Sequence, residues 1–221
     1  MQTIVIDPGH GGSRRIGGSS PNNAIGSNGT LEKTLTLDVA LRLKPLLLDA
    51  GFDAVLTRET DVNRGLATRA HVARDRKASV FVSIHFNGFD GRVQGTETYI
   101  HSTAGKRSLE LALLVQQSVR GATGLKDRGV KRASFGVLNA AEHHKQTAAC
   151  LVEVSFLDVP AEATRLAKAA YRQAIAKALL AAIQTFLSAA KTAIRKPLPD
   201  ATRHEPEDGY ELTVRRDSEN L

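Results

Sequence analysis

The 221-residue sequence is poor in cysteine, aromatic residues and long apolar runs. Its single cysteine excludes a framework of intrachain disulfides and a zinc knuckle built on cysteine pairs. Tryptophan is absent and aromatic residues make up 5%, so a stacking platform for single-stranded nucleic acid is not expected. No apolar run approaches the roughly 20 residues that cross a bilayer. What remains, 42% apolar and 24% charged residues, is the composition of a globular chain that can bury a core.

The first residues, Met1 to Asp7, lack the basic region and the long apolar region of a signal peptide. Three interpretations follow from this pattern. The protein stays inside the cell, it leaves by another route, or a leader has been removed from the chain.

Charge is distributed unevenly along a chain whose net charge is +7. Residues 1–196 hold 27 basic and 16 acidic side chains, which gives +11, and residues 197–221 hold 3 and 7, which gives −4. A basic body favours an anionic partner such as nucleic acid, anionic lipid or an anionic wall polymer, although a basic surface without a specific partner fits equally well. The last segment is polar and shows no periodicity. We therefore expect one domain over residues 1–196 and a flexible acidic tail over 197–221.

Apolar periodicity alternates between the two-residue period of strands and the longer period of helices. Strands are expected at Thr3–Ile6, Phe52–Thr57, Ser79–His85, Gly95–His101, Ser134–Leu138 and Ala148–Val154. Helices are expected at Leu31–Ala50, with Thr30 as the N-cap, and at Val62–Lys77, Lys106–Arg120 and Ala161–Ala190. Residues 11–30 are rich in Gly, Ser and Asn and predict a long loop, which is often functional. The alternation predicts a single α/β domain, a mostly parallel twisted sheet of about six strands with helices on both faces.

Polar side chains recur where the predicted strands end. In a parallel α/β sheet, ligands bind beyond the carboxyl ends of the strands. His10 follows the first strand, His85 ends the third, Glu153 lies near the end of the last, and Glu32 opens the first long helix. Two His and one carboxylate with an open fourth position form a catalytic zinc set, and a further carboxylate can serve as general base. The pattern therefore predicts His10, Glu32 and His85 as zinc ligands and Glu153 as the base.

Other side chains of similar chemistry keep this assignment open. His101 lies along a strand and the pair His143 and His144 lies in a loop, and either could replace a ligand. His71 is on a basic helix and is expected at the surface. Cys150 is in an apolar strand without a neighbouring His, which is typical of a small buried side chain rather than a nucleophile.

Seven motifs occur in an order shared with one enzyme family. They are Ile4–Gly12 (IVIDPGHGG), Leu31–Lys33 (LEK), Leu56–Asp61 (LTRETD), Ser83–Gly88 (SIHFNG), Gly95–Tyr99 (GTETY), Gly129–Arg132 (GVKR) and Leu151–Leu157 (LVEVSFL). In these motifs, over about residues 3 to 187, the chain resembles the zinc-dependent N-acetylmuramoyl-L-alanine amidases of the amidase-3 family.

The resemblance implies the same roles that the strand ends predict. It implies one zinc ion per chain on His10, Glu32 and His85, and Glu153 as the catalytic carboxylate. The implied reaction is hydrolysis of the amide between the lactyl group of N-acetylmuramic acid and L-alanine of the stem peptide in peptidoglycan. Glu153 would take a proton from the attacking water and pass it to the leaving amine.

Two further residues are candidates for support of this site. Asp7 is expected either to hold a ligating His through its second ring nitrogen or to cap the turn that follows it, and Asn87 is expected to order the loop after His85.

Some wall-remodelling members of the family insert an inhibitory helix between the GTETY and LVE strands. Here the predicted helix Lys106–Arg120 and the next strand fill that stretch, so we expect an open groove.

Two other classes of function are compatible with the sequence. One is a non-catalytic amidase-like module that binds or regulates the wall, and the other is a nucleic-acid binder, which the charge permits but no base-reading motif supports. Within the enzyme class, a bacteriolytic phage lysin, a secreted effector and a housekeeping amidase all fit. We expect a monomer that acts on peptidoglycan at the cell wall or in the periplasm, without a specific nucleic-acid partner or a transmembrane segment.

Overall fold

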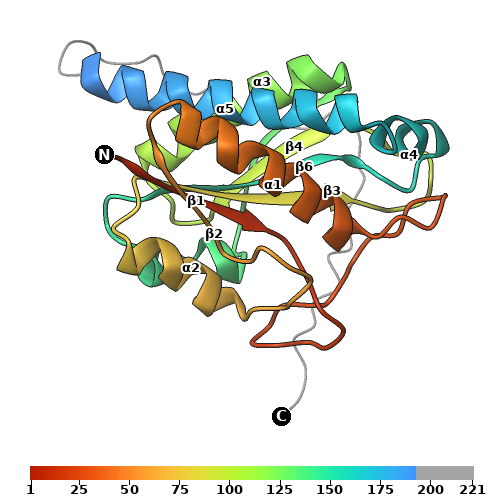
Figure 1. Cartoon of the computed structure of the whole chain (residues 1–221), viewed down its shortest axis with the longest axis horizontal. Coiled ribbons are helices and arrows are strands. Elements are labelled where there is room, and N and C mark those ends of the chain that lie inside the picture. The colour runs from red at the N-terminus through yellow and green to blue at the C-terminus, as the bar shows by residue number, and fades with distance from the viewer. Residues whose placement is uncertain (193–221) are drawn as a thin grey trace.

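One six-stranded sheet organises the computed structural model, which describes residues 1–192 (Figure 1). The strands are β1 Thr3–Pro8, β2 Asp53–Leu56, β3 Val80–Asn87, β4 Thr96–His101, β5 Asp127–Ala133 and β6 Ala148–Phe156. They lie in the order β2-β1-β3-β6-β4-β5, and each neighbouring pair is parallel except β4 with β6. The expected mostly parallel α/β sheet of six strands is confirmed.

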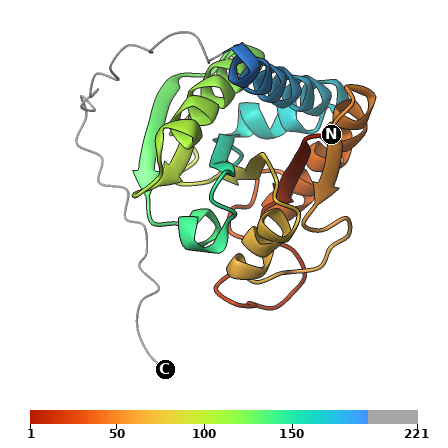
Figure 2. The same ribbon diagram turned by 90° about the vertical axis from the view of Figure 1, so that its left-hand side faces the viewer.

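Helices cover both faces of this sheet. They are α1 Glu32–Asp49, α2 Leu66–Asp75, α3 Lys106–Thr123, α4 Pro160–Leu166 and α5 Ala169–Thr192. One face carries α1, α3 and α5, and the other carries α2 together with the 3-10 turns Gly136–Leu138 and Ala140–Glu142 (Figures 1 and 2). Within residues 1–192, no helix combines the length and the apolar character needed to cross a membrane.

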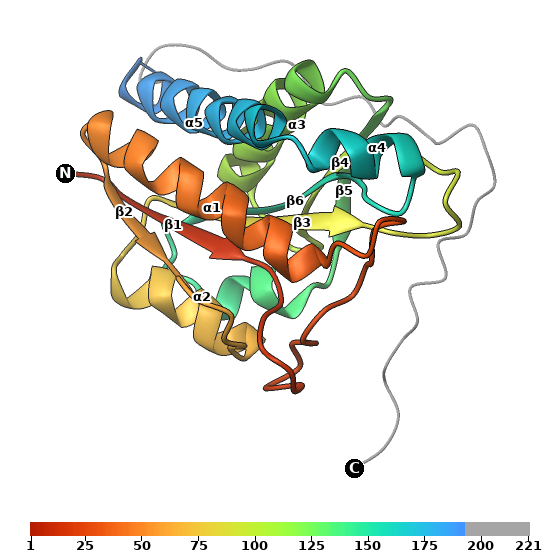
Figure 3. The ribbon, with the colours of Figure 1, turned by 45° about the vertical axis from the view of Figure 1, so that its right-hand side comes forward.

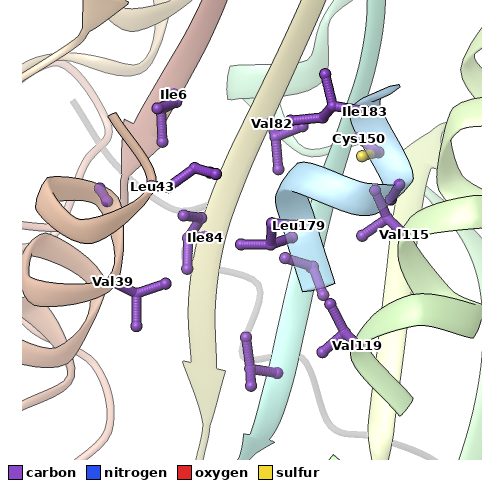
Figure 4. Close-up of a cluster of buried hydrophobic side chains, with 14 of the residues drawn as sticks. Ile6, Val39, Leu43, Val82, Ile84, Val115, Val119, Cys150, Leu179 and Ile183 are labelled. Carbon is purple, nitrogen blue, oxygen red and sulfur yellow. The ribbon is translucent and has the colours of Figure 1, made fainter. Parts of the chain in front are cut away.

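Side chains of the central strands point alternately into two cores. On β3, Val82 and Ile84 pack with Cys150 of β6 beneath α1, α3 and α5 (Figure 4). Phe81 and Leu151 face the other way, toward α2 and the 3-10 turns. Because both faces are covered, these strands are apolar almost throughout. Burial raises the pKa of the Cys150 thiol, which is the inert buried side chain that the sequence predicts.

The face toward α2 changes from apolar to polar along the direction of the strands. Phe81 is followed on this face by Ser83 and His85, and Leu151 on β6 is followed by Glu153. The arrows of β1 and β3 point to the same edge, where residues 11–30 form the predicted long loop (Figure 3). The fold thus places a row of polar side chains at the carboxyl edge of the sheet.

The strand expected at Ser134–Leu138 is wrong. The fifth strand, β5, lies at Asp127–Ala133, and Gly136–Leu138 forms a 3-10 turn whose Val137 and Leu138 pack against the sheet. Strand β5 is at the edge of the sheet and most of its side chains are half-exposed, so it lacks the apolar run of a buried strand. The apolar side chains of the turn produced the misleading pattern instead.

Several helix boundaries also differ from the sequence expectations, and α2 begins at Leu66 rather than at Val62. Helix α1 has Leu31 rather than Thr30 at its N-cap, without a side-chain cap. The long helix expected over Ala161–Ala190 is two helices, and Arg172 of α5 donates hydrogen bonds to the carbonyls of Leu166 and Ala167 at the end of α4 (2.6 and 2.9 Å). Those bonds satisfy carbonyls that a continuous helix would have used internally. The expected tail over 197–221 lies outside the described residues, as do residues 193–196 of the expected domain.

Candidate catalytic and metal site

His10, Glu32 and His85 converge from three separate elements. His10 lies in the turn after β1, Glu32 is the first residue of α1, and His85 is on β3. One possible ligand atom from each lies within 4.8 Å of the others. His10 Nε2 is 3.1 Å and His85 Nδ1 is 2.9 Å from the same carboxylate oxygen, Glu32 Oε1. Zinc bonds of about 2.0–2.2 Å would hold tetrahedral ligand atoms roughly 3.3 Å apart, so the arrangement fits that ion.

The turn after β1 brings its backbone very close to His85. A Cβ atom at Gly9 would lie 2.3 Å from Cε1 of the His85 ring, so this position requires glycine. His10 itself has a left-handed backbone with φ of 61°, which costs a non-glycine residue about 1–2 kcal/mol. Arg69 stabilises that conformation by donating to the His10 carbonyl at 2.7 Å. Strain that the surrounding structure fixes in this way is typical of functional sites.

Contacts behind the three side chains fix their orientation. His10 Nδ1 lies 3.1 Å from the carbonyl oxygen and 3.0 Å from the hydroxyl of Ser20, which leaves Nε2 directed at Glu32. Glu32 Oε2 accepts from the Ala24 backbone N–H at 3.0 Å, and Oε1 accepts from that of Phe86 at 3.2 Å. Both Ser20 and Ala24 belong to the long loop, so this loop positions two of the three candidate ligands. Such outer contacts are the usual companions of metal-binding His and carboxylate groups.

Electrostatics favour an ionised Glu32 at the centre of this cluster. Burial would raise the pKa of Glu32, but the two imidazoles outweigh it and hold the pKa well below its usual range. Burial is also the largest influence on His85 and lowers its pKa, because Glu32 compensates for it only in part. Burial would lower the pKa of His10, but Glu32 outweighs it and raises that pKa, so a divalent cation that binds here would displace a proton.

Glu153 stands beside this cluster on β6. Its Cα is paired in register with that of His85, so the two side chains rise from the same face of neighbouring parallel strands. Within residues 1–192, its buried Oε2 has no hydrogen-bond partner. Burial, followed by the negative charges of Glu32 and Glu97, raises the pKa of Glu153 well above its ordinary value. A carboxyl group with a raised pKa is a stronger base than an ordinary one, which suits a group that accepts a proton and releases it later.

The two supporting candidates make different contacts. Asp7 is buried and its carboxylate accepts hydrogen bonds from Thr57, Ser83 and Arg69 (2.5, 2.7 and 2.8 Å), so it reaches His10 through Arg69 rather than directly. Asn87 accepts from the Gly88 N–H at the start of the next loop. Its amide also donates to Glu97 at 3.0 Å.

The alternative histidines lie apart from the cluster. His101 ends β4, which runs antiparallel to its neighbour β6, so it is at the opposite edge of the sheet and bonds Thr103. His143 is buried against Phe81, bonds the carbonyl of Val137, and is accompanied by His144. In the described part of the chain, the only group of three or more His, Cys, Asp or Glu that could hold a metal is His10, Glu32 and His85.

The sequence analysis did not identify a charged cluster centred on Glu97. This buried residue of β4 is the antiparallel register partner of Glu153, and it binds Arg128 and Lys131 of β5. The signal available in the sequence was a glutamate inside a predicted strand, which requires a partner when it is buried.

Comparison with known proteins assigns the chain to a family. Residues 4–185 match the family model described as N-acetylmuramoyl-L-alanine amidase. The chain is 36% identical over 180 residues to the N-acetylmuramoyl-L-alanine amidase LytC of Bacillus subtilis, covering 80% of this chain and 34% of that protein. It is 28% identical over 223 residues to AmiA of Escherichia coli, covering 80% and 73%. The chain thus spans about a third of the length of LytC.

Solved structures agree in fold. The catalytic domain of the amidase CwlV from Bacillus (Paenibacillus) polymyxa superposes with a TM-score of 0.75 at 32% identity, covering 85% of this chain and 99% of that one. An N-acetylmuramoyl-L-alanine amidase from Clostridium difficile 630 gives 0.76 at 29% identity, covering 85% and 97%. The chain is thus an α/β protein with a candidate metal site, made of two His and one Glu, at the carboxyl edge of a mostly parallel sheet. The chain belongs to the N-acetylmuramoyl-L-alanine amidase family, the amidase-3 family.

Proposed function

We propose that the protein is a zinc-dependent peptidoglycan hydrolase that cleaves the amide between N-acetylmuramic acid and the L-alanine of the stem peptide. The observation that carries the proposal is the convergence of His10, Glu32 and His85 beside Glu153, whose buried Oε2 has no hydrogen-bond partner among residues 1–192. The family to which the chain belongs supplies the substrate class. Its members act on the cell wall, so the proposed site of action is the wall or the periplasm.

The three clustered side chains are the proposed ligands of one zinc ion per chain. A bound zinc ion would supply a Lewis acid that polarises the scissile carbonyl and lowers the pKa of water. His10 and Glu32 are oriented for this role by Ser20 and Ala24, and Gly9 leaves room for His85. Little reorganisation of these side chains would then be needed on binding, which favours affinity.

Glu153 is the proposed general base. Its raised pKa suits a group that takes a proton from the attacking water and later gives it to the leaving amine of alanine. The negative charges of Glu32 and Glu97 oppose ionisation of Glu153, so a proton that it accepts is retained until the amine departs. Arg69 and Asp7 are proposed to hold the turn that carries His10, and Asn87 the turn after His85.

The connection between β4 and β6 supports an open groove. It contains α3, β5 and the two 3-10 turns, and α3 packs with α5 on the face away from the candidate ligands. We propose on this basis that no helix of this connection blocks the site. Peptidoglycan is the proposed partner, and the protein is proposed to act as a monomer.

The test is digestion of purified sacculi followed by mass spectrometry of the soluble products. The zinc-loaded protein is expected to release stem peptides that begin with a free L-alanine amine. A Glu153→Ala variant and a chelated sample are expected to release none, and a Glu110→Ala variant, altered on α3 on the opposite face, is expected to match the wild type. Intact sacculi in every sample would contradict the proposal and favour a non-catalytic wall-binding module.

A further inference from the structure

Glu97 is a fully buried carboxylate with four hydrogen-bond donors. Its Oε2 accepts from Arg128 Nε and from Lys131 Nζ, both at 2.7 Å. Its Oε1 accepts from the hydroxyl of Tyr99 at 2.9 Å and the amide of Asn87 at 3.0 Å. Two cations on one carboxylate leave the cluster with an excess of one positive charge.

A distortion of β5 brings the two cations to the same carboxylate. Residues 128 and 131 are three positions apart and would lie on opposite faces of a regular strand. The register with β4 shifts between Thr96 and Thr98, which pair with Asp127 and Val130, and Gly129 between them has a φ of 77°. Such a bulge redirects a side chain, and it is a recurrent feature beside active sites. This positive φ favours glycine and is strained for residues with a side chain.

Arg128 keeps its outer edge open. Its Nε is bound to Glu97, and its guanidinium lies over the ring of Phe156, 5.1 Å from the centroid. Its two terminal amino groups have no hydrogen-bond partner within residues 1–192, and the side chain is 20% exposed. A guanidinium held in this way presents two parallel N–H donors, which match the two oxygens of a carboxylate.

This open edge lies next to the proposed catalytic carboxylate. Glu97 and Glu153 are register partners on the adjacent strands β4 and β6, and they share the face on which His85 stands. The negative charge of Glu97 also contributes to the raised pKa of Glu153, which reflects the same proximity. Strand β4 separates Glu153 on β6 from Arg128 on β5, so a substrate that extends from Glu153 across β4 would approach Arg128.

We propose that Arg128, supported by Glu97 and Lys131, is a specificity determinant that binds a free carboxylate of the stem peptide close to the alanine of the scissile amide. This inference rests on the proposed function and names the part of the substrate that the site selects. The candidate carboxylate is that of the residue after alanine, because it is the acidic group nearest the cleaved bond on the peptide side. Lys131 neutralises the negative charge of Glu97, so that the positive charge of the Arg128 guanidinium is available to attract the ligand.

The test uses two synthetic muramoyl peptides that differ at one group. In one, the residue after alanine has a free α-carboxylate, and in the other that group is a carboxamide. Wild-type protein is expected to cleave the carboxylate peptide with a kcat/KM about 10- to 100-fold higher, mostly through KM, because charge-assisted bidentate bonds discriminate on that scale. Arg128→Met is expected to lose this preference, so that its kcat/KM is the same for the two peptides.

Two further variants separate recognition from folding. Arg128→Lys keeps the charge beside Glu97 but lacks the fork, and it is expected to retain most of the fold stability and lose most of the preference. Arg132→Met is the control because it removes another cation of β5. The side chain of Arg132 donates to the carbonyls of Ser102 and Ala104. The variant is expected to leave the preference unchanged.

Binding of both peptides to Glu153→Gln protein, measured by calorimetry, provides a readout that does not need turnover. A preference in binding without cleavage by the wild type would contradict the proposed function and support the inference. Equal cleavage of both peptides by the wild type, or an Arg128→Met variant that loses the same factor on both, would overturn the inference and leave the proposed function intact.

Discussion

His85 and Glu153 are Cα partners on the parallel strands β3 and β6, so their side chains stand one strand apart on the same face. This relationship couples a candidate metal ligand to a candidate base without any intervening loop. Because both strands are buried within the sheet, the distance between the two groups is fixed by backbone hydrogen bonds rather than by loop conformation.

Replacement of Glu153 by Gln is expected to reduce amide hydrolysis by about 10²- to 10⁴-fold, the range that general acid–base catalysis contributes. The variant is expected to melt at or above the wild-type temperature, because it removes a carboxyl whose buried Oε2 has no hydrogen-bond partner within residues 1–192 and that faces the charges of Glu32 and Glu97. The measurements are product release from sacculi and thermal unfolding. Glu110→Gln on α3 serves as the control, and an active Glu153→Gln protein would exclude this residue as the base.

Zinc content tests the ligand set directly. Wild-type protein dialysed against zinc and then against buffer is expected to retain one ion per chain by elemental analysis, and His10→Ala or Glu32→Gln is expected to retain much less than one. His101→Ala, altered at the opposite edge of the sheet, is expected to keep the full content. Loss of zinc in the His101 variant, with retention in the other two, would require a different ligand set.

The fold was predictable from the sequence where both faces of a strand are covered. Strands β3 and β6 have nearly continuous apolar runs because helices pack on both sides of them, and their positions were predicted to within a few residues. Strand β5 was not predicted because an edge strand does not need apolar side chains on both faces. Two of its charged residues form ion pairs with Glu97 instead. Local periodicity carries no information about which strand lies at the edge.

The candidate site was predictable in part for a similar reason. In parallel sheets the ends of strands meet at one edge, so His10, His85 and Glu153 could be grouped from chain order alone. The proximity of Glu97 to Glu153 depends on the antiparallel insertion of β4 beside β6, which no local spacing indicates. The roles of these residues in catalysis stay predictions.

The buried pair of Asp7 and Arg69 predicts a loss of stability in acid. Burial would raise the pKa of Asp7, but Arg69, Thr57 and Ser83 outweigh it and hold the pKa below its usual value. A depressed pKa means that the stabilisation is complete above the unfolded value of about 3.9 and is lost as the pH falls through the lower folded value.

Asp7→Asn is accordingly expected to cost about 3–5 kcal/mol in the free energy of unfolding at pH 7, because it leaves the Arg69 guanidinium buried without its partner. Urea unfolding at several pH values is the measurement, and the difference between variant and wild type should shrink below pH 4. Asp61→Asn, which breaks an exposed pair with Lys33, is expected to cost less than about 1 kcal/mol. A difference between Asp7→Asn and wild type that is independent of pH would contradict the assignment.

Gly9→Ala tests whether the close approach of the first turn to His85 matters for metal binding. The added methyl group would lie 2.3 and 2.4 Å from Cε1 and Nε2 of the ring, so the ring must move away from the position in which its Nδ1 faces Glu32. Displacement of a ligand by this amount is expected to weaken zinc binding by at least about 10-fold, as changes in the shell around a metal site do. The measurement is a competition titration against a chelator of known affinity.

Gly121→Ala, inside α3, is the matched control because its methyl group meets nothing within 4 Å, and it is expected to leave the affinity unchanged. Wild-type affinity in the Gly9 variant would show that His85 can move without loss and is not a necessary ligand.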